Sequence, residues 1–80
     1  MDTIDFETSQ TLQSASFDRA RDVIRIVFRN QAVYEYAPRP LQDPPDDMSL
    51  LFEDLALADS PGAFFQRKIR HLYYKRIETV

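Results

Sequence analysis

Alternating apolar and polar residues in the middle of the chain predict a β-hairpin. Residues 23–29 are rich in β-branched side chains, and Ile24, Ile26 and Phe28 fall on one face of an extended strand while arginines fall on the other. Residues 32–36 repeat the alternation after a turn-prone Asn-Gln pair. Two such segments separated by a short polar turn are typical of antiparallel strands that pair with each other.

Weaker patterns at both ends of the chain predict further strands. Residues 8–18 are rich in Ser, Thr and Gln, with Leu12 and Phe17 as apolar positions, which favours a short edge strand or an ordered arm. Residues 1–8 lack a clear pattern, and we expect an N-terminal arm whose order the sequence leaves open. Residues 73–77 alternate aromatic or apolar with basic residues, so a final strand is expected, with a continued helix as the alternative.

A first helix is expected after a proline-rich segment. Four prolines lie in residues 38–47 and predict a stiff, acidic connection that is neither helix nor central strand. Asp46 or Asp47 can cap the helix that follows, because their side chains accept hydrogen bonds from free backbone N–H groups. Leu51 and Leu55 then recur at helical spacing.

A second helix is expected to begin at Ser60 and Pro61. Ser is a favoured N-cap, and Pro at the first helical position gives up an N–H that has no partner within the helix. Phe65 and Ile69 lie four residues apart and would face the sheet. We interpret Gly62, the one glycine of the chain, as permitting close approach of this helix to neighbouring backbone.

Together these elements predict a single α+β domain over residues 1–80. We expect a small antiparallel β-meander of about three to four strands with two helices packed on one face. A chain of this length supports one compact core and no second domain.

The composition removes most catalytic and metal-binding chemistry from consideration. Cysteine is absent and His71 is the lone histidine, which excludes disulfides, thiolate metal sites and a thiol nucleophile and leaves no histidine pair. We therefore expect no enzymatic activity and no cofactor. The acidic N-terminus differs from a secretory signal, and no apolar stretch approaches the roughly 20 residues of a membrane span, so we expect a cytoplasmic protein.

Charge is segregated along the chain. The net charge is −3, but acidic residues dominate residues 1–18 and 41–59, whereas basic residues dominate residues 19–40 and 60–80. The basic C-terminal segment favours binding of nucleic acid, and the bipolar pattern equally favours pairing of opposite ends between proteins.

The candidate nucleic-acid contacts combine cations, which bind phosphates, with flat rings, which stack on unpaired bases. The simpler interpretation is that a helix needs a solvated face and that tyrosines anchor the core. The candidates are Arg67, Lys68, Arg70, Lys75 and Arg76 for phosphates and Tyr34, Tyr36 and Tyr74 for bases.

Three motifs resemble those of a known family. The chain has a Tyr-x-Tyr motif in residues 34–36, the pair Phe17-Asp18, and a longer run around the start of the second helix. These motifs resemble those of the KTSC domain, which is named for the C-terminus of some lysyl-tRNA synthetases and also occurs as small free-standing bacterial proteins. The resemblance implies a small α+β domain with a suggested role in RNA binding. The longer run consists of Ala58, Ser60, Gly62, Phe64, Phe65, Gln66, Ile69 and Arg70.

The orientation of Tyr34 and Tyr36 depends on the length of the hairpin turn. A two-residue turn places both rings opposite the Ile24 face, beside the strand arginines, where they form a platform for bases. A three-residue turn places them beneath the helices. We favour the buried orientation because Gln31 stands where the resembling family tends to have glycine in the turn.

Two functional hypotheses follow. The first is a non-catalytic module that binds RNA through the basic C-terminal segment and the Tyr-x-Tyr strand. The second is a protein-interaction module that self-associates or docks on a larger partner. In either case we expect no membrane partner, and a monomer or a weak homo-oligomer.

Overall fold

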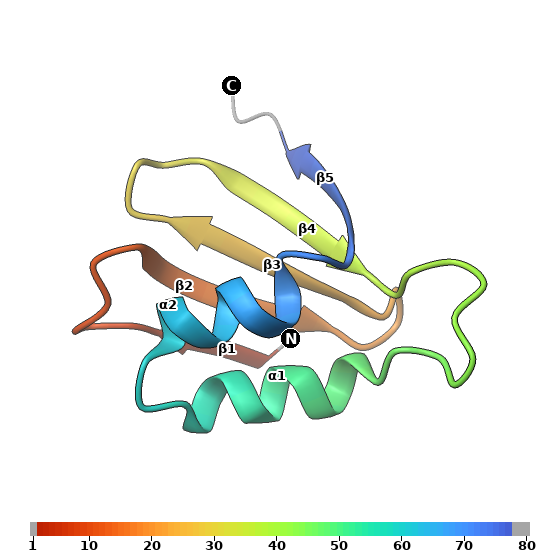
Figure 1. Ribbon diagram of the computed structural model, residues 1–80. Coiled ribbons are helices and arrows are strands. Elements are labelled where there is room, and N and C mark those ends of the chain that lie inside the picture. Colours follow the sequence, from red (N-terminus) through yellow and green to blue (C-terminus); the bar gives the residue numbers. More distant parts are fainter. Residues whose placement is uncertain (1, 78–80) are drawn as a thin grey trace.

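The computed structural model describes residues 2–77 and consists of a five-stranded antiparallel sheet with helices on one side (Figure 1). The strands follow one another in the order of the sequence, as a meander. The α+β prediction is confirmed, and the sheet has more strands than the predicted three to four. The strands are β1 (Asp2–Asp5), β2 (Leu12–Asp18), β3 (Val23–Phe28), β4 (Val33–Ala37) and β5 (Tyr73–Ile77).

The additional strand is β1, which the sequence analysis treated as an arm. It pairs with β2, so β2 lies inside the sheet rather than at its edge. Ile4 lies opposite Ala15 and packs against the core, and Phe6 beyond the strand is buried. Burial of these apolar side chains holds the segment in place, since burial of one such side chain contributes about 1.5–3 kcal/mol.

The β3–β4 hairpin has a three-residue turn. Phe28 N donates to Ala32 O at 2.9 Å, and Gln31 N donates to Phe28 O at 3.0 Å. Gln31 adopts a left-handed backbone conformation, with φ of 75°. This turn pairs Ile26 with Tyr34 and Ile24 with Tyr36. Residues directly opposite each other in a ladder share a face, so both tyrosines lie on the helix side of the sheet.

The helical layer lies between β4 and β5 in the sequence. α1 (Met48–Leu57) is capped by Asp47, whose Oδ1 accepts from Leu50 N at 3.1 Å. α2 (Pro61–Phe64) is capped by the Ser60 hydroxyl and continues into one π-helical turn, η1 (Phe65–Ile69). Both predicted helix starts are thus confirmed. The alternative of a helix continuing through residues 73–77 is wrong, because these residues form β5.

The core lies between the helices and β1 to β4. Phe17 on β2 stacks on Phe52 of α1 with ring centroids 5.6 Å apart. Ile24, Ile26 and Leu55 have no exposed surface. By contrast, nearly all side chains of β5 are exposed, so the sheet extends beyond its helical cover at this edge (Figure 1).

The space around Gly62 is ordinary. A Cβ added there would lie 3.7 Å from Thr11 Oγ1, which is a normal van der Waals distance, and the backbone is not left-handed. The interpretation of Gly62 as a site of close backbone approach is therefore wrong.

The proline-rich connection, residues 38–47, forms a projecting loop closed by Arg39 and Asp46 (Figure 1). The Arg39 side chain donates to both carboxylate oxygens of Asp46, at 3.1 and 2.9 Å, and its backbone N–H donates at 2.8 Å. These bonds lower the pKa of Asp46. The loop is therefore ordered, although most of its side chains are exposed.

Candidate nucleic-acid interface

A groove of about 540 Å³ lies on the helix side of the sheet, along the strip that the helices leave uncovered. We call it the aromatic groove. β4 and β5 supply three tyrosines and an arginine, β3 and its turn supply the end wall, and the second helix with the residue after it supplies the opposite wall. Its lining residues are Phe28, Asn30, Ala32, Tyr34, Tyr36, Phe65, Arg70, Tyr74 and Arg76.

The rings of the groove form one connected cluster. Tyr36 and Tyr74 lie opposite each other in register, with ring centroids 6.0 Å apart, and Tyr34 lies 6.3 Å from Tyr36 and 5.9 Å from Tyr74. Phe28 and Phe65 meet these tyrosines edge to face, Phe28 against Tyr34 and Phe65 against Tyr36. Such contacts hold the rings in fixed orientations.

Exposure increases from the floor of the groove to its rim. Tyr36 is only 4% exposed, Tyr34 is half-buried and Tyr74 is 58% exposed. Burial, followed by the neighbouring tyrosines, raises the pKa of Tyr36 to about 12. The floor of the groove is thus a buried phenol that stays protonated to a higher pH than a free tyrosine, and Tyr74 offers an open ring.

Two exposed arginines complete the groove. Arg76 lies on the same face of β5 as Tyr74, directly opposite Tyr34 of β4. Arg70 follows η1, and its Nη1 donates to Gln66 Oε1 at 2.8 Å. No carboxylate lines the groove, and within residues 2–77 no ion pair engages either arginine. Both guanidinium groups belong to exposed residues, so each can bind an anion from solution.

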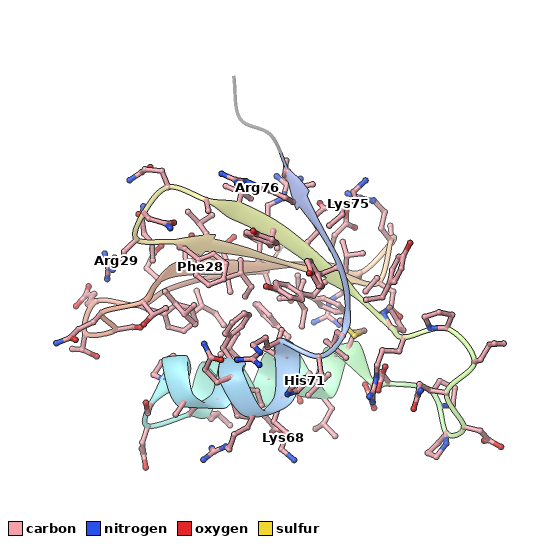
Figure 2. The ribbon with its side chains drawn as sticks, turned by 45° about the horizontal axis from the view of Figure 1, so that its top comes forward. Phe28, Arg29, Lys68, His71, Lys75 and Arg76 are labelled. Atoms are coloured by element: carbon pink, nitrogen blue, oxygen red, sulfur yellow. The ribbon has the colours of Figure 1, made fainter. Side chains whose placement is uncertain are left out.

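The other predicted phosphate contacts lie elsewhere. Lys75 is opposite Glu35 in register, so it lies on the open face, which is the side of the sheet without helices. Arg67 and Lys68 are exposed on η1 but do not line the groove. Figure 2 shows Lys68 on the side of the helical layer that faces away from the sheet. The structure thus brings together five of the eight predicted residues.

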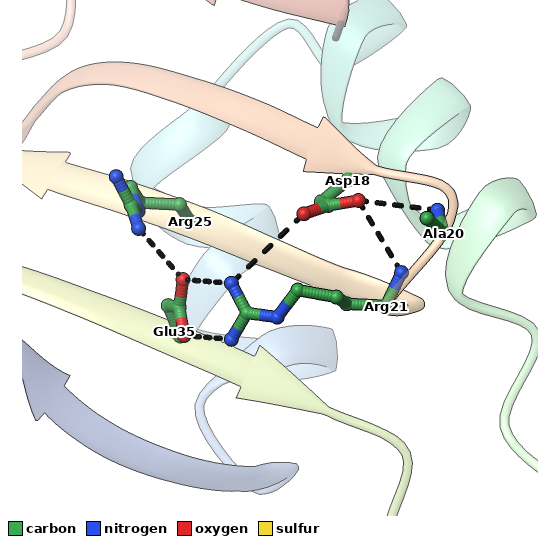
Figure 3. A network of polar contacts seen from close by, with 5 residues as sticks. All are labelled: Asp18, Ala20, Arg21, Arg25 and Glu35. Carbon is green, nitrogen blue, oxygen red and sulfur yellow. Dashed lines mark hydrogen bonds and ion pairs between the residues drawn. The ribbon is translucent and has the colours of Figure 1, made fainter.

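The open face carries no aromatic platform of the kind a two-residue turn would have produced. Its centre is Glu35, which is 4% exposed. Its carboxylate accepts hydrogen bonds from Nη1 and Nη2 of Arg21, at 3.1 and 2.8 Å, and from Nη2 of Arg25 at 2.9 Å (Figure 3). The Arg21 hydrogen bonds are the main cause that lowers the pKa of Glu35; burial opposes the shift and Arg25 adds to it. Arg29 instead donates to the backbone oxygens of Ser9 and Phe6.

Sequence reasoning assigned Phe28 and Phe65 to the core and did not place them in the lining of a groove. Each ring meets a tyrosine of the groove edge to face, and Phe65 is also buried. Their positions gave one usable signal. Phe28 is the last residue of β3, and a ring at a strand end beside a turn lies at the margin of a core.

A second hollow, of about 430 Å³, lies beside the start of α2. Hydroxyl and amide side chains line it, and its one charged residue is Asp59. Without a cation it does not favour phosphate. In the part of the chain that the structure describes, no cluster of three or more potential metal ligands occurs, and His71 is exposed.

Comparisons with known proteins bear on the fold. No family model and no curated protein matches the chain. Among solved structures, the KTSC domain protein YPO2434 from Yersinia pestis matches with a TM-score of 0.77 and 20% sequence identity, covering 96% of this chain and 97% of that one. The chain therefore has the fold of a KTSC domain protein, and the resemblance predicted from the sequence is confirmed at the level of fold.

The helices of residues 2–77 are all too short and too polar to cross a membrane. The longest, α1, has 10 residues, whereas a membrane-spanning helix needs roughly 20 apolar residues.

Proposed function

We propose that this chain is a non-catalytic module that binds single-stranded RNA in the aromatic groove. One observation carries the proposal: an exposed ring, Tyr74, rests on an aromatic cluster in a groove that it shares with two arginines, and the described residues lining this groove include no carboxylate. Stacking on such a ring contributes about 1–3 kcal/mol per base. The RNA-binding role implied by the KTSC resemblance points in the same direction.

The shape of the groove favours an unpaired strand over a duplex. In a duplex the faces of the bases are stacked on each other, so they are closed to a protein ring. A groove of about 540 Å³ accommodates one base with its sugar and phosphate, and the flanking arginines then reach the phosphates on either side.

The expected binding is weak and depends on salt. Arg70 and Arg76 are the two cations of the groove, and each phosphate neutralised on a single strand contributes about 0.7 to the slope of log affinity against log salt. The acidic net charge of −3 also opposes approach of a polyanion. Arg70, Arg76 and Tyr74 are thus expected to make the main contributions to the interaction.

Two adjacent residues of β5 provide a matched test. Arg76 lies in the groove and Lys75 lies on the open face, so Arg76→Glu and Lys75→Glu change the net charge equally on opposite sides of one strand. Binding of a fluorescein-labelled oligouridine of about ten nucleotides is measured by anisotropy at about 50 mM salt. Arg76→Glu should weaken binding about tenfold or more, and Lys75→Glu less than about threefold. Equal effects, or no binding by the unmodified chain, would refute the proposal.

A further inference from the structure

The proline-rich loop presents an apolar side chain in an unusual way. Leu41, near its tip, is fully exposed and adopts a left-handed backbone conformation with φ of 63°. A left-handed backbone is unfavourable for a residue with a Cβ. Packing within the described residues does not offset this, because the side chain touches solvent on every side. Strained, exposed apolar residues are typical of binding loops.

The loop is also organised in advance. Pro38, Pro40, Pro44 and Pro45 fix their backbone φ angles, and the Arg39–Asp46 ion pair closes the base of the loop. A segment with few conformations loses little entropy when it binds. Proline rings and leucine side chains offer apolar surface that packs against aromatic rings.

The aromatic groove of this chain has the complementary chemistry. The loop has a charge of −2, from three aspartates and one arginine in residues 38–47, whereas the groove holds Arg70 and Arg76. The exposed Tyr74 ring matches the apolar surface of Leu41 and the prolines. We propose that the loop of one copy docks in the aromatic groove of a second copy.

The contact forms between copies rather than within one. The loop begins two residues after Tyr36, at the end of the groove where Tyr36 and Tyr74 lie, and Asn30 and Ala32 of the β3–β4 turn lie at the opposite end. Figure 1 shows the loop projecting away from the sheet on the side opposite that turn. The Arg39–Asp46 ion pair closes the loop in this direction, so its tip points away from the groove of its own copy and reaches the groove of another molecule.

This docking does not depend on RNA binding, but it uses the same rings. A free groove binds a base, and an occupied groove does not, so self-association would suppress RNA binding as the protein concentration rises. A contact made by one loop is small, so the association is weak, with dissociation constants of about 10–1,000 µM. It weakens as salt rises, because opposite charges attract across the contact.

Sedimentation velocity over a concentration series at low salt tests the proposal. The unmodified chain should self-associate, and Leu41→Ser should reduce the association constant about tenfold or more. Leu57→Ser is the control, because Leu57 is an equally apolar residue, 82% exposed on α1 and outside the loop. In the groove, Tyr74→Ala should abolish association, and Tyr73→Ala on the open face should not.

Mixing the two defective variants gives the decisive result. Leu41→Ser retains an intact groove and Tyr74→Ala retains an intact loop, so the mixture should associate more strongly than either variant alone. A chain that stays monomeric at every concentration, or a dimer that survives both substitutions, would overturn the proposal. Leu41 lies outside the groove, so loss of self-association by Leu41→Ser with RNA binding retained separates this result from the RNA test.

Discussion

Tyr36 and Tyr74 lie directly opposite each other on β4 and β5, with ring centroids 6.0 Å apart, but only Tyr74 is exposed. The helical layer ends above Tyr36, so the buried ring supports the open one. The binding surface that we propose therefore lies at the margin of the hydrophobic core. It also places that surface on the helix side of the sheet, where hydrophobic periodicity alone would predict only core.

The buried phenol of Tyr36 should be visible in a spectrophotometric titration. Its pKa is raised from the ordinary 10.0 to about 12, so it should stay protonated to a higher pH than a free phenol. The folded chain should therefore show a late ionisation step that is absent in Tyr36→Phe and in the unfolded chain. Because the folded state retains this proton longer, stability should fall as pH rises from about 10 to 12. A folded chain without this late step would contradict the prediction.

The ion pairs of Glu35 with Arg21 and Arg25, which we call the Glu35 cluster, should make stability depend on pH in the acidic range. Its lowered pKa means that its contribution is fully present above the ordinary value of 4.5 and is lost as pH falls through the folded-state value. Urea unfolding at about pH 7 should show Glu35→Gln destabilised by about 1 kcal/mol, since the arginine partners are about half exposed.

The pH profile provides the internal control for that cluster. Between about pH 6 and pH 3 the unmodified chain should lose more stability than Glu35→Gln, because the amide does not titrate. Lys75 lies on the same face, but the ion pairs of Glu35 are with Arg21 and Arg25. The substitution Lys75→Gln should therefore leave the pH profile unchanged. Parallel profiles for the unmodified chain and Glu35→Gln would show that the cluster does not contribute in this range.

Gln31 should be replaceable by glycine with a gain in stability. Its φ of 75° is unfavourable for a residue with a Cβ and free of strain for glycine. Gln31→Gly is expected to raise the free energy of unfolding by about 0.5–1 kcal/mol, and Gln31→Val to lower it by at least as much. Thermal unfolding followed by circular dichroism measures both changes. If Gln31→Gly were the less stable variant, the three-residue turn would be in doubt.

The sequence predicted the parts of this fold that depend on local chemistry. Asp47, Ser60 and Pro61 mark the helix starts because capping involves only neighbouring residues. The N-terminal strand was missed because its order depends on two apolar side chains, Ile4 and Phe6, that pack against distant residues. No local pattern contains that information.

The candidate site was predicted in composition but not in position. Tyr34, Tyr36, Tyr74, Arg70 and Arg76 were all expected to contact nucleic acid, and they line one groove. Their common location depends on one turn residue, since a shorter turn reverses the face of both β4 tyrosines. Lys75 lies outside the groove because successive side chains of a strand point to opposite faces, and its neighbours Tyr74 and Arg76 face the groove.

The most direct test of the account is the NMR response of two adjacent tyrosines to RNA. Tyr73 and Tyr74 are similarly exposed, at 63% and 58%, but lie on opposite faces of β5. Addition of a short oligouridine at a low protein concentration should shift the ring protons of Tyr74 upfield, as stacking requires, and leave those of Tyr73 unchanged. Unchanged Tyr74 resonances at saturating RNA, or a shift confined to Tyr73, would contradict the assignment of the aromatic groove as the binding site.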